Sequence, residues 1–278
     1  MADYKVQETS LIAVADAIRE KAGTSDDLVF PEGFVEAVAA IEAGGGSSEL
    51  EEQFIAMIER AGTPVTKLPE GLTTIGGYAF AYCTNLALTE LPAGLTTIGD
   101  SAFTNCIKLA FTELPAGITT IGKNAFSNCT NLALTELPAG LTTIDGSAFA
   151  YCTKLALTEL PAGITTIGKN AFINCTNLAL TELPAGLTTI DGYAFASCTN
   201  LAFTELPAGI RTIDGSAFTN CTKLTELEFK GKPTLIGSGA FKGCTNLITI
   251  NVPWAEGEVS GAPWGATNAT INYNYTGG

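Results

Sequence analysis

Residues 114–136 read LPAGITTIGKNAFSNCTNLALTE, and residues 160–182 repeat this stretch with one change, Ser127 becoming Ile173. The two copies lie 46 positions apart, which is twice a period of 23 residues. Self-similarity at a fixed period indicates a repeat architecture before any single motif is interpreted. The repetition therefore predicts the fold of most of this chain.

Four apolar positions recur in every 23-residue unit. An Ala-Phe pair returns with its aromatic residue at Phe80, Phe103, Phe126, Phe149, Phe172, Phe195, Phe218 and Phe241. The cysteines keep the same spacing, at Cys83, Cys106, Cys129, Cys152, Cys175, Cys198, Cys221 and Cys244. A leucine follows each cysteine by three residues, and an isoleucine precedes each phenylalanine by five. These four positions are expected to be buried in eight successive coils.

A unit of this length is too short to enclose its own apolar side chains, so it must stack on its neighbours and share one core. LALTELP (residues 86–92) alternates apolar residues and ends in proline, which predicts a short strand. GLTTIG (residues 94–99) predicts a second strand, because it is rich in β-branched residues. The Ala-Phe to Cys segment is expected to form an irregular or helical return path. At about 4.8 Å per coil, eight coils would extend roughly 40 Å.

The repeat resembles a known family. ITTIGKNAFSNCTNL (residues 118–132) and its copies are similar to the BspA-type leucine-rich repeats of bacteria and their phages, across residues 68–252. The resemblance implies apolar strand residues three, six and eight positions after each cysteine. The last two units follow this pattern, with Leu224, Leu227 and Phe229, then Leu247, Ile250 and Val252. The inner units do not: the first has Leu86, Leu88 and Leu91, with Thr89 in an apolar slot, so a changed register or a bulge remains open.

Patterns outside the repeats predict a domain order. Residues 1–43 contain two amphipathic segments and are expected to form a helical N-terminal attachment module. Residues 44–48 (GGGSS) are a flexible linker by composition. Residues 49–66 are expected to form a capping helix, 67–252 the solenoid, and 253–278 an irregular β cap containing both tryptophans. The predicted fold class is therefore an α+β repeat protein, a leucine-rich-repeat solenoid of eight coils with a short helical N-terminal module.

The two ends carry a second resemblance. ADAIREKAG (residues 15–23) and the turn and helix expected after it look like an N-terminal module of tail and virion proteins from phages of Gram-positive hosts. The tryptophan-containing C-terminal segment looks like endings in the same group. This resemblance implies a virion component that contacts other virion proteins through residues 1–43, and a homo-oligomer. The first residues, MADYKVQETS, do not resemble a secretory signal, which favours assembly in the host cytoplasm, and no segment is apolar enough to insert into a membrane.

Eight evenly spaced cysteines predict a ladder of reduced, buried thiols. Neighbouring β-carbons in a parallel stack lie near 4.8 Å apart, about 1 Å wider than a disulfide prefers. The chain has no histidine and no CxxC pair, so a metal site is not expected. No cofactor is expected either. The absence of histidine, of a GxSxG motif and of a phosphate-binding loop argues against an enzyme.

The formal net charge of −14 comes partly from one glutamate in each unit. The repeated carboxylates are Glu90, Glu113, Glu136, Glu159, Glu182, Glu205 and Glu228. One interpretation is a solvated edge that prevents nonspecific association. The other is a strip that binds Ca²⁺ or a cationic partner, and an unchanged melting temperature during calcium titration would remove it. The acidic balance makes nucleic acid an unexpected partner.

The slots flanking Ala-Phe vary between units and are expected to face water. They hold Tyr78, Tyr82, Ser101, Asn105, Asn124, Tyr151, Tyr193 and Lys242. Exposed tyrosines combine apolar area with a hydrogen-bonding hydroxyl, which suits a receptor protein or a glycan. Neutral variation on a tolerant surface would give the same pattern.

Three functions are consistent with these features. The first is a structural phage virion component, a tail, fibre or decoration protein, that presents a repeat surface to a host protein or glycan. The second is a bacterial cell-surface adhesin of the BspA type. The third is a designed or scaffold repeat protein, which near-identical copies suggest and irregular ends oppose.

Overall fold

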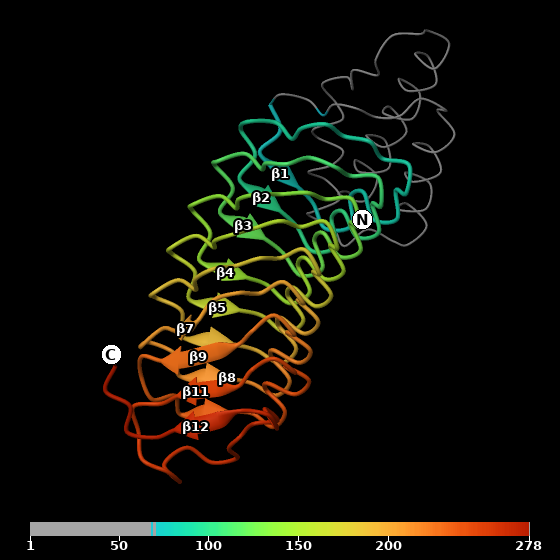
Figure 1. Cartoon of the computed structure of the whole chain (residues 1–278). Helices are drawn as coiled ribbons and strands as arrows, with labels where there is room; N and C mark the ends of the chain where they lie inside the picture. Colours follow the sequence, from blue (N-terminus) through green and yellow to red (C-terminus); the bar gives the residue numbers. More distant parts are fainter. Residues whose placement is uncertain (1–67, 69–70, 278) are drawn as a thin grey trace, which may run out of the picture.

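The computed structural model describes Leu68 and residues 71–277. These residues form a β-solenoid of about nine turns, and Figure 1 shows the coils stacked side by side in a gently curved arc. Within this part of the chain no residue is helical. The predicted solenoid is therefore confirmed, whereas the α+β fold class is wrong. The expected helices within 1–43 and 49–66 lie outside the described residues, as does the 44–48 linker.

The first file of strands comes from the Thr-Ile segments. Its members are β1 (Thr74–Ile75), β2 (Thr97–Ile98), β3 (Thr120–Ile121), β4 (Thr143–Ile144), β5 (Thr166–Ile167), β6 (Thr189–Ile190), β8 (Thr212–Ile213) and β10 (Leu235–Ile236). They pair in parallel as β1-β2-β3 and as β10-β8-β6-β5-β4. The register joins residues 23 positions apart, such as Ile167 with Ile190. The strand predicted for the GLTTIG segment is thus confirmed, and it is two residues long in each coil.

The second file is a four-stranded parallel sheet in the order β12-β11-β9-β7. Its strands are β7 (Glu205–Leu206), β9 (Glu226–Phe229), β11 (Thr249–Asn251) and β12 (Thr270–Asn272). In the coils before β7, the described residues of the LALTELP segment form no strand. Few backbone hydrogen bonds link these segments, for example from Ala156 N to Leu134 O at 3.0 Å. The prediction of a strand in every unit is therefore wrong for the inner coils.

A shift of one residue explains this difference. In β9, Leu227 and Phe229 are buried and Glu228 between them is half-buried, as alternation requires. In the preceding coil, Phe203 and Leu206 are buried with two exposed residues between them. Leu206 nevertheless pairs with Phe229, so the last apolar slot is unchanged. The pairing register is therefore unchanged and no residue is inserted, but the middle apolar residue of the inner units, such as Phe203, lies one position earlier in the repeat than Leu227.

The return path is regular but not helical. Backbone N–H groups alternate between two kinds of acceptor: Phe172 N donates to Ala194 O of the following coil at 2.8 Å, and Cys175 N donates to Phe172 O at 3.0 Å. An α-helix would direct both donors to carbonyls four residues earlier. Stacking supplies half of these hydrogen bonds from the neighbouring coil, so the segment folds as a ladder of turns.

The segment after residue 252 adds a further coil. β12 pairs in parallel with β11, and Thr249 lies opposite Thr270. Phe241 N donates to Trp264 O at 3.0 Å, continuing the hydrogen-bond ladder of the return path. Trp254 and Trp264 are buried against Phe229. The predicted count of eight coils is therefore too low, because the departure from the 23-residue period does not stop the stacking.

The phenylalanines form a continuous stack along the axis. Adjacent ring centroids lie 5.3–5.6 Å apart, with planes inclined by 3–9°. All eight rings are inaccessible to solvent, as are most of the isoleucines, cysteines and leucines at the other repeated positions. The four apolar positions predicted from the sequence are thus the core. Each coil buries its ring between the rings of its neighbours.

Candidate binding surface

Each of the eight repeats holds two residues with a left-handed backbone, five positions and one position before its cysteine. We name these positions the αL slots. Fourteen are occupied by residues other than glycine: Tyr78, Tyr82, Ser101, Asn105, Asn124, Asn128, Ser147, Tyr151, Asn170, Asn174, Tyr193, Ser197, Ser216 and Asn220, with φ between 55° and 62°. Gly239 and Gly243 fill both slots of the last repeat.

The αL slots explain the composition of the return path. Glycine adopts this conformation at no steric cost and asparagine at a small one, whereas other side chains pay about 1–2 kcal/mol. The sequence signal was present, because asparagine, serine and glycine recur at these two positions. That signal predicts exposed, variable positions but not their backbone conformation. The slots also exclude a helical return path, since each one interrupts a right-handed turn.

The four predicted tyrosines all lie in αL slots and face solvent. The exposed fractions are 50% for Tyr78, 59% for Tyr82, 44% for Tyr151 and 45% for Tyr193. The prediction that the slots flanking Ala-Phe face water is therefore confirmed for the tyrosines, but it is wrong for Ser101, which is only 6% exposed. Because the coils are spaced by little more than 5 Å, the structure arranges the slots as two rows along one flank. Tyr78 and Tyr82 share a coil, while Tyr151 and Tyr193 stand on separate coils.

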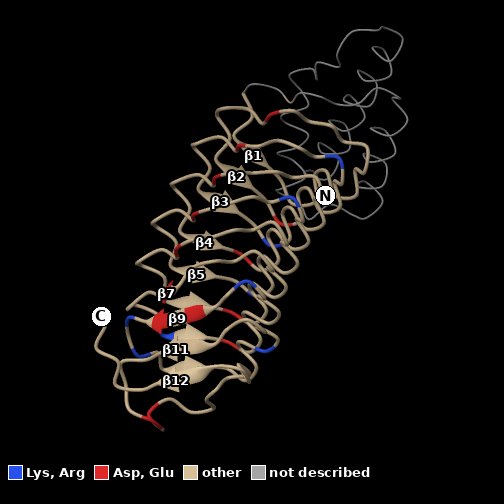
Figure 2. Cartoon of the chain, viewed as in Figure 1, with Lys and Arg blue, Asp and Glu red and all other residues tan. Residues whose placement is uncertain are grey.

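The glutamate ladder occupies another edge of the solenoid. Glu90, Glu113, Glu136, Glu159, Glu182 and Glu205 are exposed, and Glu228 is half-buried. Figure 2 shows acidic residues recurring along one margin of the stacked coils. The tyrosines belong to the return path, whereas the glutamates belong to the LALTELP segments of the inner coils and to β7 and β9. The structure thus does not bring the two predicted sets into one site.

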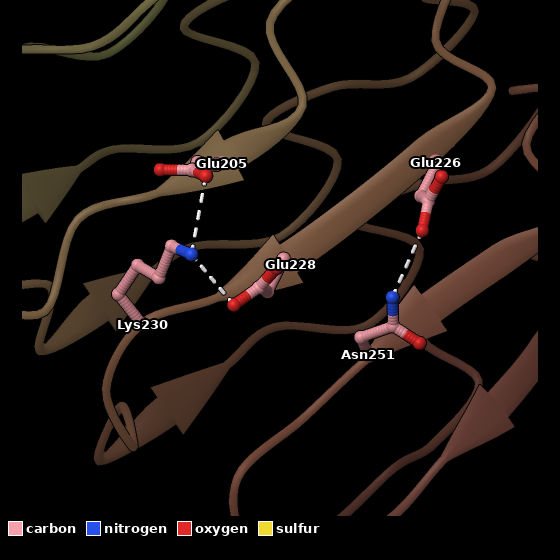
Figure 3. Close-up of polar contacts among 5 residues, drawn as sticks. All are labelled: Glu205, Glu226, Glu228, Lys230 and Asn251. Atoms are coloured by element: carbon pink, nitrogen blue, oxygen red, sulfur yellow. Dashed lines mark hydrogen bonds and ion pairs between the residues drawn. The ribbon is translucent and has the colours of Figure 1, made fainter. Parts of the chain in front are cut away.

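Lys230 closes the C-terminal end of the glutamate ladder. Its Nζ lies 2.6 Å from Glu228 Oε1 and 3.1 Å from Glu205 Oε1, as Figure 3 shows. Hydrogen bonds to Glu228 and then to Glu205 raise the pKa of Lys230. On the same sheet, Asn251 Nδ2 donates to Glu226 Oε1 at 2.9 Å. The Lys230–Glu205 and Asn251–Glu226 contacts join neighbouring coils. Together these side chains form the polar face of the sheet at this end.

The thiols lie in the core and act as hydrogen-bond donors. Sγ of each described cysteine from Cys106 onward donates to the phenylalanine carbonyl of the preceding coil, at 2.9–3.1 Å. Cys175, for example, donates to Phe149 O at 3.0 Å. All eight cysteines are buried, reduced thiols. Burial raises the pKa of Cys175 well above its ordinary value, and that of Cys244, at the end of the ladder, to about 11.

The native thiols should therefore react slowly with alkylating reagents. Only the thiolate is a nucleophile, and burial suppresses it. At pH 8 we expect no modification of Cys175 over a period in which the denatured chain is fully labelled. Cys244 should react before the six other thiols whose pKa is raised, because it is the least enclosed of these seven. Mass spectrometry of peptides after timed N-ethylmaleimide labelling measures this order, and early labelling of Cys175 would contradict it.

Two aspartates are neighbours where the first strand file meets the return path. Asp191 and Asp214 follow paired isoleucines of β6 and β8. Burial, and then the charge of Asp214, raise the pKa of Asp191. The folded state therefore binds a proton at Asp191 more tightly than the unfolded state. The stability contributed by this group is greatest at low pH and falls as the pH rises from the ordinary aspartate value through the folded pKa.

Asp191→Asn should consequently raise the melting temperature at pH 7, by an amount corresponding to less than about 1 kcal/mol. The gain should disappear near pH 3, where the carboxyl of the native protein is already neutral. Thermal unfolding of both proteins from pH 3 to pH 7 tests this. Asp214→Asn provides the matched control: the double variant should gain less than the sum of the single variants, because one substitution already removes the repulsion.

Among residues 71–277, no group of histidine, cysteine, aspartate or glutamate side chains could hold a metal ion. The search of the described residues also found no helix long and apolar enough to cross a membrane. The chemical groups at the surface of the solenoid include phenol rings, amides, hydroxyls, carboxylates and lysine ammonium groups, distributed along its length.

Comparison with known proteins identifies the repeat. The description "BspA type Leucine rich repeat region (6 copies)" matches residues 63–179 and 174–259, which together exceed half of the chain. The chain belongs to the BspA-type leucine-rich repeat family. The resemblance inferred from the spacing of Ile, Ala-Phe, Cys and Leu is thus confirmed. No curated protein matches the chain.

Several solved structures of leucine-rich repeat proteins are similar to the chain, with TM-scores below 0.5. A leucine-rich cell surface protein from Faecalibacterium prausnitzii is 24% identical, with 76% of this chain and 79% of that chain covered and a TM-score of 0.42. The leucine-rich repeat protein of T. pallidum is 29% identical, with coverage of 65% and 76% and a TM-score of 0.44. The pneumococcal vaccine antigen PcpA is 18% identical, with coverage of 77% and 57% and a TM-score of 0.42. None of these comparisons supports the resemblance to phage proteins or the expected virion component.

Proposed function

We propose that this BspA-type leucine-rich repeat protein is a non-enzymatic adhesin of the bacterial cell surface. In this proposal, the outside of the solenoid binds a macromolecular partner, such as a host protein or glycan. The observation that carries the proposal is the division of each coil: the interior repeats Ile, Phe, Cys and Leu, while the αL slots vary among tyrosine, asparagine and serine. An extended surface with variable side chains suits binding along its length.

The chemistry of the described residues supports binding over catalysis. The thiols are buried and hydrogen-bonded, so they are poor nucleophiles. Half of the described carboxylates recur once per coil along one edge, whereas an enzyme concentrates distinct groups in one place. Stacked side chains repeated along the coils offer many equivalent contacts, which favours a long partner.

The proposal is tested with beads coated with the full chain. They are applied to surfaces bearing extracellular matrix proteins, secreted mucins or cultured epithelial cells, and beads carrying an acidic globular protein of similar size are the control. We expect saturable attachment to at least one surface, which free chain inhibits. Attachment no greater than the control on every surface would contradict adhesion. Antibody labelling of intact cells of the native source tests the location, and labelling only after lysis would contradict it.

A further inference from the structure

The tyrosines occupy a backbone conformation that their side chains disfavour. A bulky residue with positive φ is a rare outlier, whereas asparagine is several-fold enriched there. Ten of the fourteen non-glycine αL slots hold asparagine or serine, and four hold tyrosine. The backbone is held in place by the stack, since Tyr78 N donates to Asp100 O and Tyr82 N to Thr104 O of the following coil. The coil therefore imposes the conformation on whichever residue the sequence supplies.

The tyrosine rings are not buried in the core, so core packing does not offset the cost of their backbone conformation. The phenylalanines of the stack are inaccessible to solvent, whereas each of the four tyrosines exposes between 44% and 59% of its surface. A strained residue without a role in the core is a mark of function, because the stacked neighbours already determine the backbone. The strain indicates that the exposed phenol rings serve contacts outside the chain.

Three of the four tyrosines have a solvent-accessible amide or hydroxyl side chain beside them in the row. Tyr82 is followed by Asn105 in the next coil, whereas Ser101, which follows Tyr78, is buried. The two single tyrosines are flanked on both sides: Tyr151 by Asn128 and Asn174, and Tyr193 by Asn170 and Ser216. Neighbouring coils are spaced by 5.3–5.6 Å, as measured along the phenylalanine stack. A ring face and a short hydrogen-bonding group thus recur side by side.

This combination matches a neutral carbohydrate. The ring face can cover the apolar C–H face of a sugar, while amides and hydroxyls both donate to and accept from sugar hydroxyls. The charge also selects this partner. Residues 71–89, which include Tyr78 and Tyr82, contain no charged residue, so this segment offers no ionic group to a charged polymer.

We propose that the αL tyrosines and their asparagine and serine neighbours form a binding row for a neutral polysaccharide or oligosaccharide. The inference deepens the proposed adhesive function and rests on it. The stacked coils supply rings at fixed positions along one flank, so a glycan chain lying along the solenoid would contact several slots at once. In this row, the four tyrosines act together with the asparagines that lie beside them in neighbouring coils.

The test replaces all four tyrosines by asparagine, the residue that the same slots carry elsewhere. Binding of the full chain is measured on an array of neutral polysaccharides and neutral mucin-type oligosaccharides, with heparin as the anionic probe. We expect the native protein to bind neutral glycans, and the combined Tyr78→Asn, Tyr82→Asn, Tyr151→Asn and Tyr193→Asn variant to bind at least tenfold more weakly. The variant should also melt at a higher temperature, because asparagine tolerates the αL backbone. A merely structural role for the tyrosines cannot produce these opposite changes.

Leu235→Thr is the matched control, because it removes an exposed apolar side chain from β10 and introduces the residue found in β8. It should leave glycan binding unchanged. The proposal is overturned if the native protein binds no neutral glycan, binds only heparin, or binds equally after the tyrosines are replaced. Bead attachment that survives periodate oxidation of the surface glycans would also overturn it, while leaving adhesion to a protein partner intact. Absence of any attachment would instead contradict the proposed function.

Discussion

Phe172→Ala is expected to lower the free energy of unfolding by about 3–5 kcal/mol. Phe172 is inaccessible to solvent, and its ring lies 5.6 Å from that of Phe149 and 5.4 Å from that of Phe195. Truncation leaves a cavity that two coils share, and the hydrogen bonds of the return path prevent the coils from collapsing into it. Two stacked-ring contacts are lost in addition to the buried area.

Chemical denaturation followed by circular dichroism measures the change. Phe126→Ala is the matched control, because residues 114–136 and 160–182 differ only at Ser127 and Ile173. The two variants should lose similar stability if stacking determines the effect. A loss below about 1 kcal/mol at both positions would show that the stack does not carry the core. A second unfolding transition would show that the substitution uncouples the two parts of the solenoid, since stability in repeat proteins depends on the interfaces between neighbours.

Gly168→Ala is expected to destabilise the protein by about 1–3 kcal/mol. A Cβ added at Gly168 would lie 2.8 Å from Gly146 N, 2.9 Å from Asp145 C and 3.0 Å from Ile144 O. All three are backbone atoms of the preceding coil, so no side chain can rotate away. The coils would have to separate at a place where Gly168 N donates to Ile144 O at 2.8 Å.

Gly146→Ala is the control for the same chemical change. There, the nearest atom to an added Cβ is Lys169 O at 3.4 Å, an ordinary contact. We expect this variant to be neutral or slightly stabilised, because alanine lowers the conformational entropy of the unfolded chain. Thermal unfolding of the two variants should therefore give shifts of different size, with only Gly168→Ala strongly lowered. Equal shifts would mean that intercoil approach is not the cause.

The periodicity of the sequence predicted the solenoid and its core correctly. Ile167, Phe172, Cys175 and Leu178 are all inaccessible to solvent, as their 23-residue recurrence indicated. Such positions are readable because burial tolerates few residue types, so selection for stacking leaves the same side chain in each unit. The predicted exposure of the four tyrosines was also correct, because the positions that they occupy hold asparagine or serine in other coils.

The return path and the second strand file were harder to predict. The Ala-Phe to Cys segment reads as irregular or helical, because its hydrogen-bond acceptors belong to the next coil and leave no trace in local propensity. The one-residue displacement of Phe203 relative to Leu227 was visible in the sequence, but its effect on strand formation was not. The period did not predict the last coil, because Trp264 and β12 stand where the other coils carry the repeated residues.

The sequence by itself determined the period, the buried side chains and the family, because these depend on which residues recur. Tertiary structure decided the αL slots and the rows that they form, because their backbone angles are imposed by hydrogen bonds between coils. It also decided which polar side chains are neighbours. Tyr151 lies next to Asn128 and Asn174 only because stacking brings residues 23 positions apart to within little more than 5 Å.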